Sequence, residues 1–77
     1  MKIPKETQEK IIRYQALKAS AEQAVQFFWG EKRTVKYNTE AVVLMDEIKE
    51  YVFTTKPEWK SFNWRYIDGD YEVFEGK

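Results

Sequence analysis

The stretch PKETQEKIIRYQALKASAEQAVQFFW, residues 4–29, decides how the rest of the chain can be arranged. It has no glycine and no proline after Pro4, it is rich in Glu, Gln, Lys and Ala, and Gly30 follows it directly. These features predict one long helix that begins at Pro4 and ends at Trp29. At 1.5 Å per residue this helix would be about 38 Å long, so the remaining residues must pack along it.

Apolar residues form two stripes on this helix. The stronger stripe recurs at spacings of three and four and is expected to face the core: Tyr14, Leu17, Ala21, Ala24, Val25 and Phe28. The weaker stripe lies elsewhere on the helix and contains small residues: Ile12, Ala16, Ala19 and Phe27. It is either incidental apolar exposure or a contact with a second copy of the chain, in which the alanines allow close approach. Because the helix is too long for its own chain to cover, we expect a homo-oligomer built on this stripe.

A second helix is expected after a connection at residues 30–38. Within this connection, polar and apolar side chains alternate at residues 34–37, as they do in a strand, so these residues could form a third short strand. Asn38 or Thr39 would cap the helix, which ends near Thr55 because the proline that follows favours an extended chain before it. The inner stripe of this helix is apolar and regularly spaced, with Leu44 and Tyr51 flanking it: Ala41, Met45, Ile48 and Val52.

The C-terminal stretch SFNWRYIDGDYEVFE, residues 61–75, has two alternating segments around Asp68-Gly69. Asp-Gly is the preferred central pair of a type I′ turn, and a turn at this position fixes the strand register. The resulting cross-strand pairs are aromatic, oppositely charged or apolar: Tyr66 with Tyr71, Arg65 with Glu72, and Trp64 with Val73. The sequence therefore predicts an α+β fold in a single small domain, residues 1–77, in which a two-helix hairpin is followed by a C-terminal β-hairpin packed on it.

Composition narrows the function. The sequence has no cysteine and no histidine, which excludes thiolate nucleophiles, imidazole bases and zinc sites built from these ligands. The 13 basic and 13 acidic residues cancel, which disfavours general nucleic-acid binding. No apolar run suits a membrane helix and the N-terminus does not resemble a signal peptide, so we expect a cytoplasmic protein. We expect no enzymatic activity, no cofactor and no metal; the fragment Asp68-Gly69-Asp70 suits a turn better than a calcium loop.

Large rings near connections are typical anchors of protein interfaces. The candidate partner-binding residues share an aromatic or basic character and a place near a connection: Trp29, Lys32, Arg33, Tyr37 and Trp59. For Trp59, core packing, partner contact and stacking on a ligand are all open. We expect a small non-enzymatic binding protein that occupies a surface of another protein, of the accessory or inhibitor type found in bacteria and phages. The alternative is a homo-oligomeric small-ligand or nucleotide-binding protein with a site between protomers.

Overall fold

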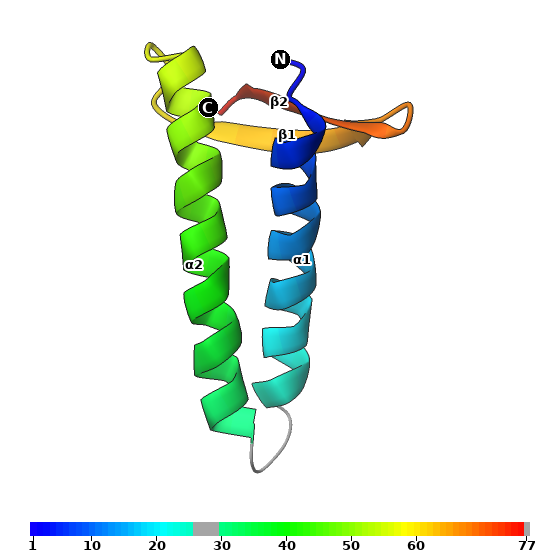
Figure 1. Ribbon diagram of the computed structural model, residues 1–77, viewed down its shortest axis with the longest axis vertical. Helices are drawn as coiled ribbons and strands as arrows, with labels where there is room; N and C mark the ends of the chain where they lie inside the picture. The colour runs from blue at the N-terminus through cyan, green and yellow to red at the C-terminus, as the bar shows by residue number, and fades with distance from the viewer. Residues whose placement is uncertain (26–29, 77) are drawn as a thin grey trace.

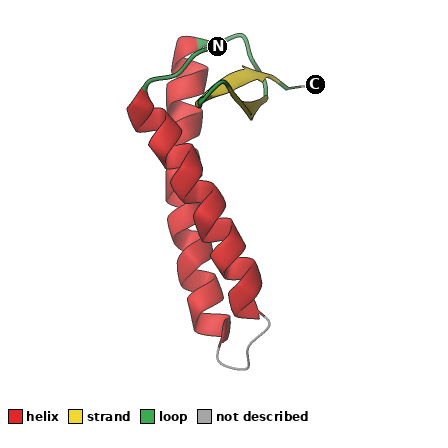
Figure 2. Ribbon diagram, turned by 90° about the vertical axis from the view of Figure 1, so that its right-hand side faces the viewer, coloured by secondary structure: helices red, strands yellow, loops and turns green. Residues whose placement is uncertain are grey.

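Two antiparallel helices carry a two-stranded sheet across one face, near one end (Figures 1 and 2). The computed structural model describes residues 1–25 and 30–76. The elements in chain order are α1 (Lys5–Val25), α2 (Gly30–Thr55), β1 (Phe62–Ile67) and β2 (Asp70–Glu75). This arrangement confirms the predicted α+β fold of a two-helix hairpin with a β-hairpin packed on it. The molecule is elongated, 43 × 26 × 23 Å, because both helices continue well past the sheet (Figure 1).

The helix boundaries differ from the prediction at the connection. The first helix follows Pro4 as predicted, and the amide of Gln8 donates to the Pro4 carbonyl at 3.0 Å. Its predicted last residues, Phe27, Phe28 and Trp29, lie outside the described residues. The prediction that Gly30 ends a helix is wrong, since Gly30 is the first residue of α2. Glycine is accepted where a helix begins, and the Glu, Lys and Arg that follow it are good helix formers.

The predicted connection at residues 30–38 and the optional strand at residues 34–37 are also wrong, because both lie within α2. Alternation over four residues is too short to distinguish a strand from a turn of helix. Thr39 does not cap the helix; its hydroxyl donates to the Val35 carbonyl one turn earlier, at 2.8 Å. The predicted end is confirmed at Thr55. Among the described residues, no helix combines the length and apolarity needed to cross a membrane.

The β-hairpin has the predicted register. Tyr66 pairs with Tyr71 and Arg65 with Glu72. The turn residues Asp68 and Gly69 have φ values of 51° and 86°, as a type I′ turn requires. Turn chemistry and cross-strand pairing therefore agree with the observed sheet.

The core lies where the two helices meet the sheet. Its buried members come from α1, α2 and β2 and from the N-terminal residues: Ile3, Ile11, Ile48, Val52 and Val73. Burial of Ile48 and Val52 confirms part of the predicted inner stripe of α2. On α1 the centre of the stripe is Ile11 and Ala21, whereas Leu17 is only half-buried at its margin.

The contact surface between α1 and α2, the helix seam, has large apolar side chains near the sheet and small or polar side chains further away. Near the sheet it contains Ile11 and Ile48, whose side chains are fully buried. Further along it contains the buried alanines Ala21 and Ala41 and a polar contact, in which Lys18 Nζ donates to Asn38 Oδ1 at 3.2 Å. We call this part of the helix pair, residues 15–25 and 30–44, the distal arm. The sheet crosses the helices beyond one end of this arm (Figure 1).

Candidate functional site

A groove lies in the corner between the helix pair and β1. Two cavities of about 210 and 590 Å³ share Tyr14, Met45 and Lys49 in their linings, so they form one continuous concave surface. We call it the β1 groove. Its lining comes from both helices, β1 and the residues just before it: Tyr14, Lys18, Asn38, Ala41, Val42, Met45, Asp46, Lys49, Phe53, Lys60, Ser61, Phe62, Asn63 and Trp64.

Aromatic rings fix the wall of the groove. Trp64 of β1 meets Tyr14 of α1 edge-on, with ring centroids 5.8 Å apart. Phe62 of β1 meets Phe53 of α2 in the same way at 5.4 Å. Edge-to-face pairs at these distances are favourable, so β1 is attached to both helices by ring contacts. The wall and floor of the groove are therefore held on packed secondary structure.

The groove is locally basic although the chain as a whole has no net formal charge. Its lining contains Lys18, Lys49 and Lys60, against one acidic residue, Asp46. Among the described residues no carboxylate forms an ion pair with these lysines, whereas Lys10, outside the groove, lies 3.5 Å from Glu47. The described residues of the groove lining therefore carry an excess of positive charge.

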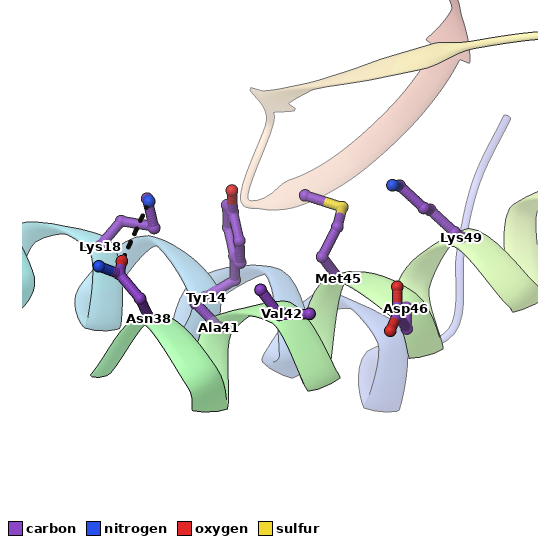
Figure 3. A pocket seen from close by; sticks show the side chains of 8 residues that line it. All are labelled: Tyr14, Lys18, Asn38, Ala41, Val42, Met45, Asp46 and Lys49. Carbon is purple, nitrogen blue, oxygen red and sulfur yellow. Dashed lines mark hydrogen bonds between the residues drawn. The ribbon is translucent and has the colours of Figure 1, made fainter. Parts of the chain in front are cut away.

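The polar groups of the groove project on the side of the helices that carries the sheet. Figure 3 shows the Tyr14 hydroxyl and the amines of Lys18 and Lys49 on this side, with Met45 between them. A segment lying in the groove would meet apolar surface at Tyr14 and Met45 and ammonium groups beside it. Within residues 1–25 and 30–76, no group of three or more acidic side chains is placed to hold a metal ion.

The candidate partner-binding residues predicted from the sequence, as far as the structure describes them, lie outside the lining of the β1 groove. Lys32 and Arg33 are exposed and Tyr37 is half-buried near the start of α2, at the end of the helix pair away from the sheet. Trp59 follows the other end of α2, where it is half-buried against the core. Most of the length of α2, about 35 Å, separates Trp59 from Lys32. Trp29 lies outside the described residues, so the structure does not bring this set together.

The described residues that were predicted for self-association are all exposed to solvent. Ile12 has 52% of its surface exposed, and Ala16 and Ala19 are also exposed. Phe27 lies outside the described residues. The described part of the stripe is therefore accessible to a second copy, and self-association stays a prediction.

Sequence reasoning missed the β1 groove, although one signal of it was present. Lys18 lies four residues after Tyr14 and three before Ala21, which is a seam position in a helix pair. A lysine at such a position indicates that the seam opens towards solvent there. The groove lies at this opening, with Lys18 in its lining.

Comparisons with models of protein families, with curated protein sequences and with solved structures find no match for this chain. The function is therefore argued from the groove itself.

Proposed function

We propose that the protein is a non-catalytic binding protein that holds a segment of another protein in the β1 groove. The observation that carries the proposal is the combination of a fixed aromatic wall with lysines that have no acidic partner among the described residues. Such a protein would act as accessory and inhibitor proteins do, by occupying a surface that its partner otherwise uses.

The aromatic part of the groove favours a protein segment as its occupant. Tyr14 and Trp64 are large side chains that their mutual contact already orders, so binding would cost them little conformational entropy. Met45 lies in both cavities, and its unbranched side chain can adapt to different apolar groups. A fixed wall with an adaptable floor suits the side chains of a bound segment.

The basic part of the groove favours an acidic segment. Lys18 and Lys49 lie to either side of Tyr14 and Met45 (Figure 3), and Lys60 lines the groove just before β1. Complementary charge speeds encounter and rejects basic partners, and it contributes more to specificity than to raw affinity. The rival function, a small-ligand site between protomers, instead requires a second copy of the chain.

Selection from a peptide display library tests the proposal. The target is the folded protein, compared with the double variant Lys18→Glu with Lys49→Glu. The control is Lys32→Glu with Lys36→Glu, an equal charge change at exposed residues outside the groove lining. We expect acidic sequences with apolar residues to be enriched, and binding to weaken about tenfold or more in the groove variant, a change of about 1.4 kcal/mol. The proposal fails if no peptide is enriched, or if both variants weaken binding equally.

A further inference from the structure

The two edges of the sheet differ in their hydrogen bonding. Along β2 the outer edge is occupied: the Val73 amide donates to the Met1 carbonyl at 2.9 Å, and the Met1 ammonium donates to the Val73 carbonyl at 2.6 Å. The Tyr71 amide, two residues earlier, donates to Gln8 Oε1 at 3.0 Å. The N-terminal residues and one side chain of α1 therefore cover this edge.

The outer edge of β1 also has N–H and C=O groups that point away from the hairpin, but within the described part of the chain they have no partner there. Because the Val73 N–H and C=O point away from β1, Val73 and Trp64 form a non-hydrogen-bonded pair of the ladder. By alternation, the N–H and C=O groups that point outward from β1 belong to Phe62, Trp64 and Tyr66. Among the described residues, nothing outside the hairpin hydrogen-bonds to these main-chain groups. This edge is a template for another strand.

The free edge borders the β1 groove. The main chain of β2 bonds to Gln8, although its Tyr71 hydroxyl reaches as far as Gln15. Figure 1 shows β1 on the side of β2 that is nearer the distal arm, so the outer edge of β1 faces this arm. A strand added there would lie about 4.8 Å from β1. With a rise of about 1.5 Å per residue, that spacing equals the length of about three residues along a helix axis. That distance leads from Tyr14 towards Lys18, into the cavity that both residues line.

We infer that the β1 groove binds an extended acidic segment, which joins the sheet as a third strand along β1. The inference rests on the proposed function and adds the binding mode. Main-chain hydrogen bonds to Phe62, Trp64 and Tyr66 supply affinity, as in other proteins that bind a peptide by strand addition. Specificity comes from every second side chain, the set that faces the helices: apolar members of this set meet Tyr14 and Met45, and a carboxylate among them reaches Lys18 or Lys49.

A second copy of the chain fits the same edge poorly. The distal arm continues below β1, so it provides a floor for a single added strand (Figure 1). A second copy would have to place its own helix pair beside this arm, whereas a single extended segment has no such requirement. A second copy would also bring Lys18, Lys49 and Lys60 of its own groove to a surface that is already basic.

Hydrogen exchange measured by NMR tests the inference. The probe is a blocked synthetic peptide in which every second residue is valine or glutamate in turn and the others are threonine, added in excess to the whole protein; the same peptide with lysine in place of glutamate is the control. We expect slower exchange at the amides of Phe62, Trp64 and Tyr66 with the acidic peptide alone. The amides of Asn63 and Arg65 already bond to β2 and should not change. If the acidic peptide does not slow the exchange of the Phe62, Trp64 and Tyr66 amides, the inference is wrong.

Two substitutions at one exposed position separate main-chain from side-chain binding. Tyr66→Pro removes an outward N–H without breaking the β1–β2 ladder, whereas Tyr66→Val loses the ring but keeps the donor. We expect affinity for the acidic peptide to be about fivefold lower in Tyr66→Pro than in Tyr66→Val. Equal affinities, with both variants folded by circular dichroism, would contradict strand addition.

The remaining outcomes distinguish the inference from the proposed function. If peptides selected from the library bind in the groove but leave the β1 amides unprotected, the inference fails and the proposed function stands. If no peptide binds the groove at all, both fail. Protection of the same amides in the free protein that grows with protein concentration would show that a second copy occupies the edge, which also overturns the inference.

Discussion

The ring of Trp64 meets the ring of Tyr14 at an interplanar angle of 87°, and this contact joins β1 to α1 at the wall of the groove. It connects a strand near the C-terminus to the first helix, with the groove directly beside it. The contact therefore contributes both to stability and to the shape of the site.

A double-mutant cycle measures that contribution. We expect Tyr14→Leu and Trp64→Leu to be less destabilising together than the sum of the two single changes. The coupling should be about 0.5–1.5 kcal/mol, the usual range for an aromatic pair. Urea unfolding of the four proteins gives the free energies, and strictly additive values would show that the rings are not coupled.

Truncation of the core should be costly for a chain of this size. Ile48 is fully buried, so Ile48→Ala should lower the free energy of unfolding by about 2–5 kcal/mol. Leu17→Ala is the matched comparison, and it should cost less because Leu17 is only half-buried. Thermal unfolding followed by circular dichroism checks both, and a melting temperature of Ile48→Ala within a degree or two of the wild type would contradict the assigned core.

The hairpin turn depends on the backbone of Gly69. With φ at 86°, this position suits glycine, and a β-branched side chain resists such a conformation even though space around it is open. Gly69→Val should therefore be markedly destabilising, whereas Gly69→Asn should be tolerated better because asparagine accepts positive φ. Equal melting temperatures for the two variants would contradict this account of the turn.

The exposed stripe on α1 predicts self-association. Light scattering at micromolar concentration should show a particle larger than a monomer. Ala16→Glu should shift it towards the monomer without unfolding it, because glutamates from two copies would be buried close together. Lys36→Glu, at an exposed residue of α2, is the control. A monomeric wild type at high concentration would end this prediction.

Local chemistry explains which parts of the fold could be predicted. The β-hairpin depends on a two-residue turn and on neighbours a few residues apart, so Asp68-Gly69 was enough to set its register. The start of α2 depends on tertiary context instead. Thr34 and Val35 form helix because the helix formers before them and the packing of α2 against α1 outweigh a short alternation.

The position of Lys18 marks one point of the groove, but the groove as a whole could not be predicted because it needs two long-range facts. One is the rotation of α1, whose seam is centred on Ile11 rather than on Leu17. The other is the pairing of Met1 with Val73, 72 residues apart, which covers β2 and leaves β1 as the open edge. Neither leaves a local pattern in the sequence, and together they decide which edge faces the lysines.

The most direct test of the account is the set of nuclear Overhauser effects between the protein and an acidic peptide selected from the library. Strand addition in the β1 groove predicts contacts from the peptide backbone to the amide of Trp64, and from its apolar side chains to the ring of Tyr14 and the methyl group of Met45. Contacts confined to the exposed stripe at Ile12 and Ala16, or to the start of α2, would show that the β1 groove is not the binding site.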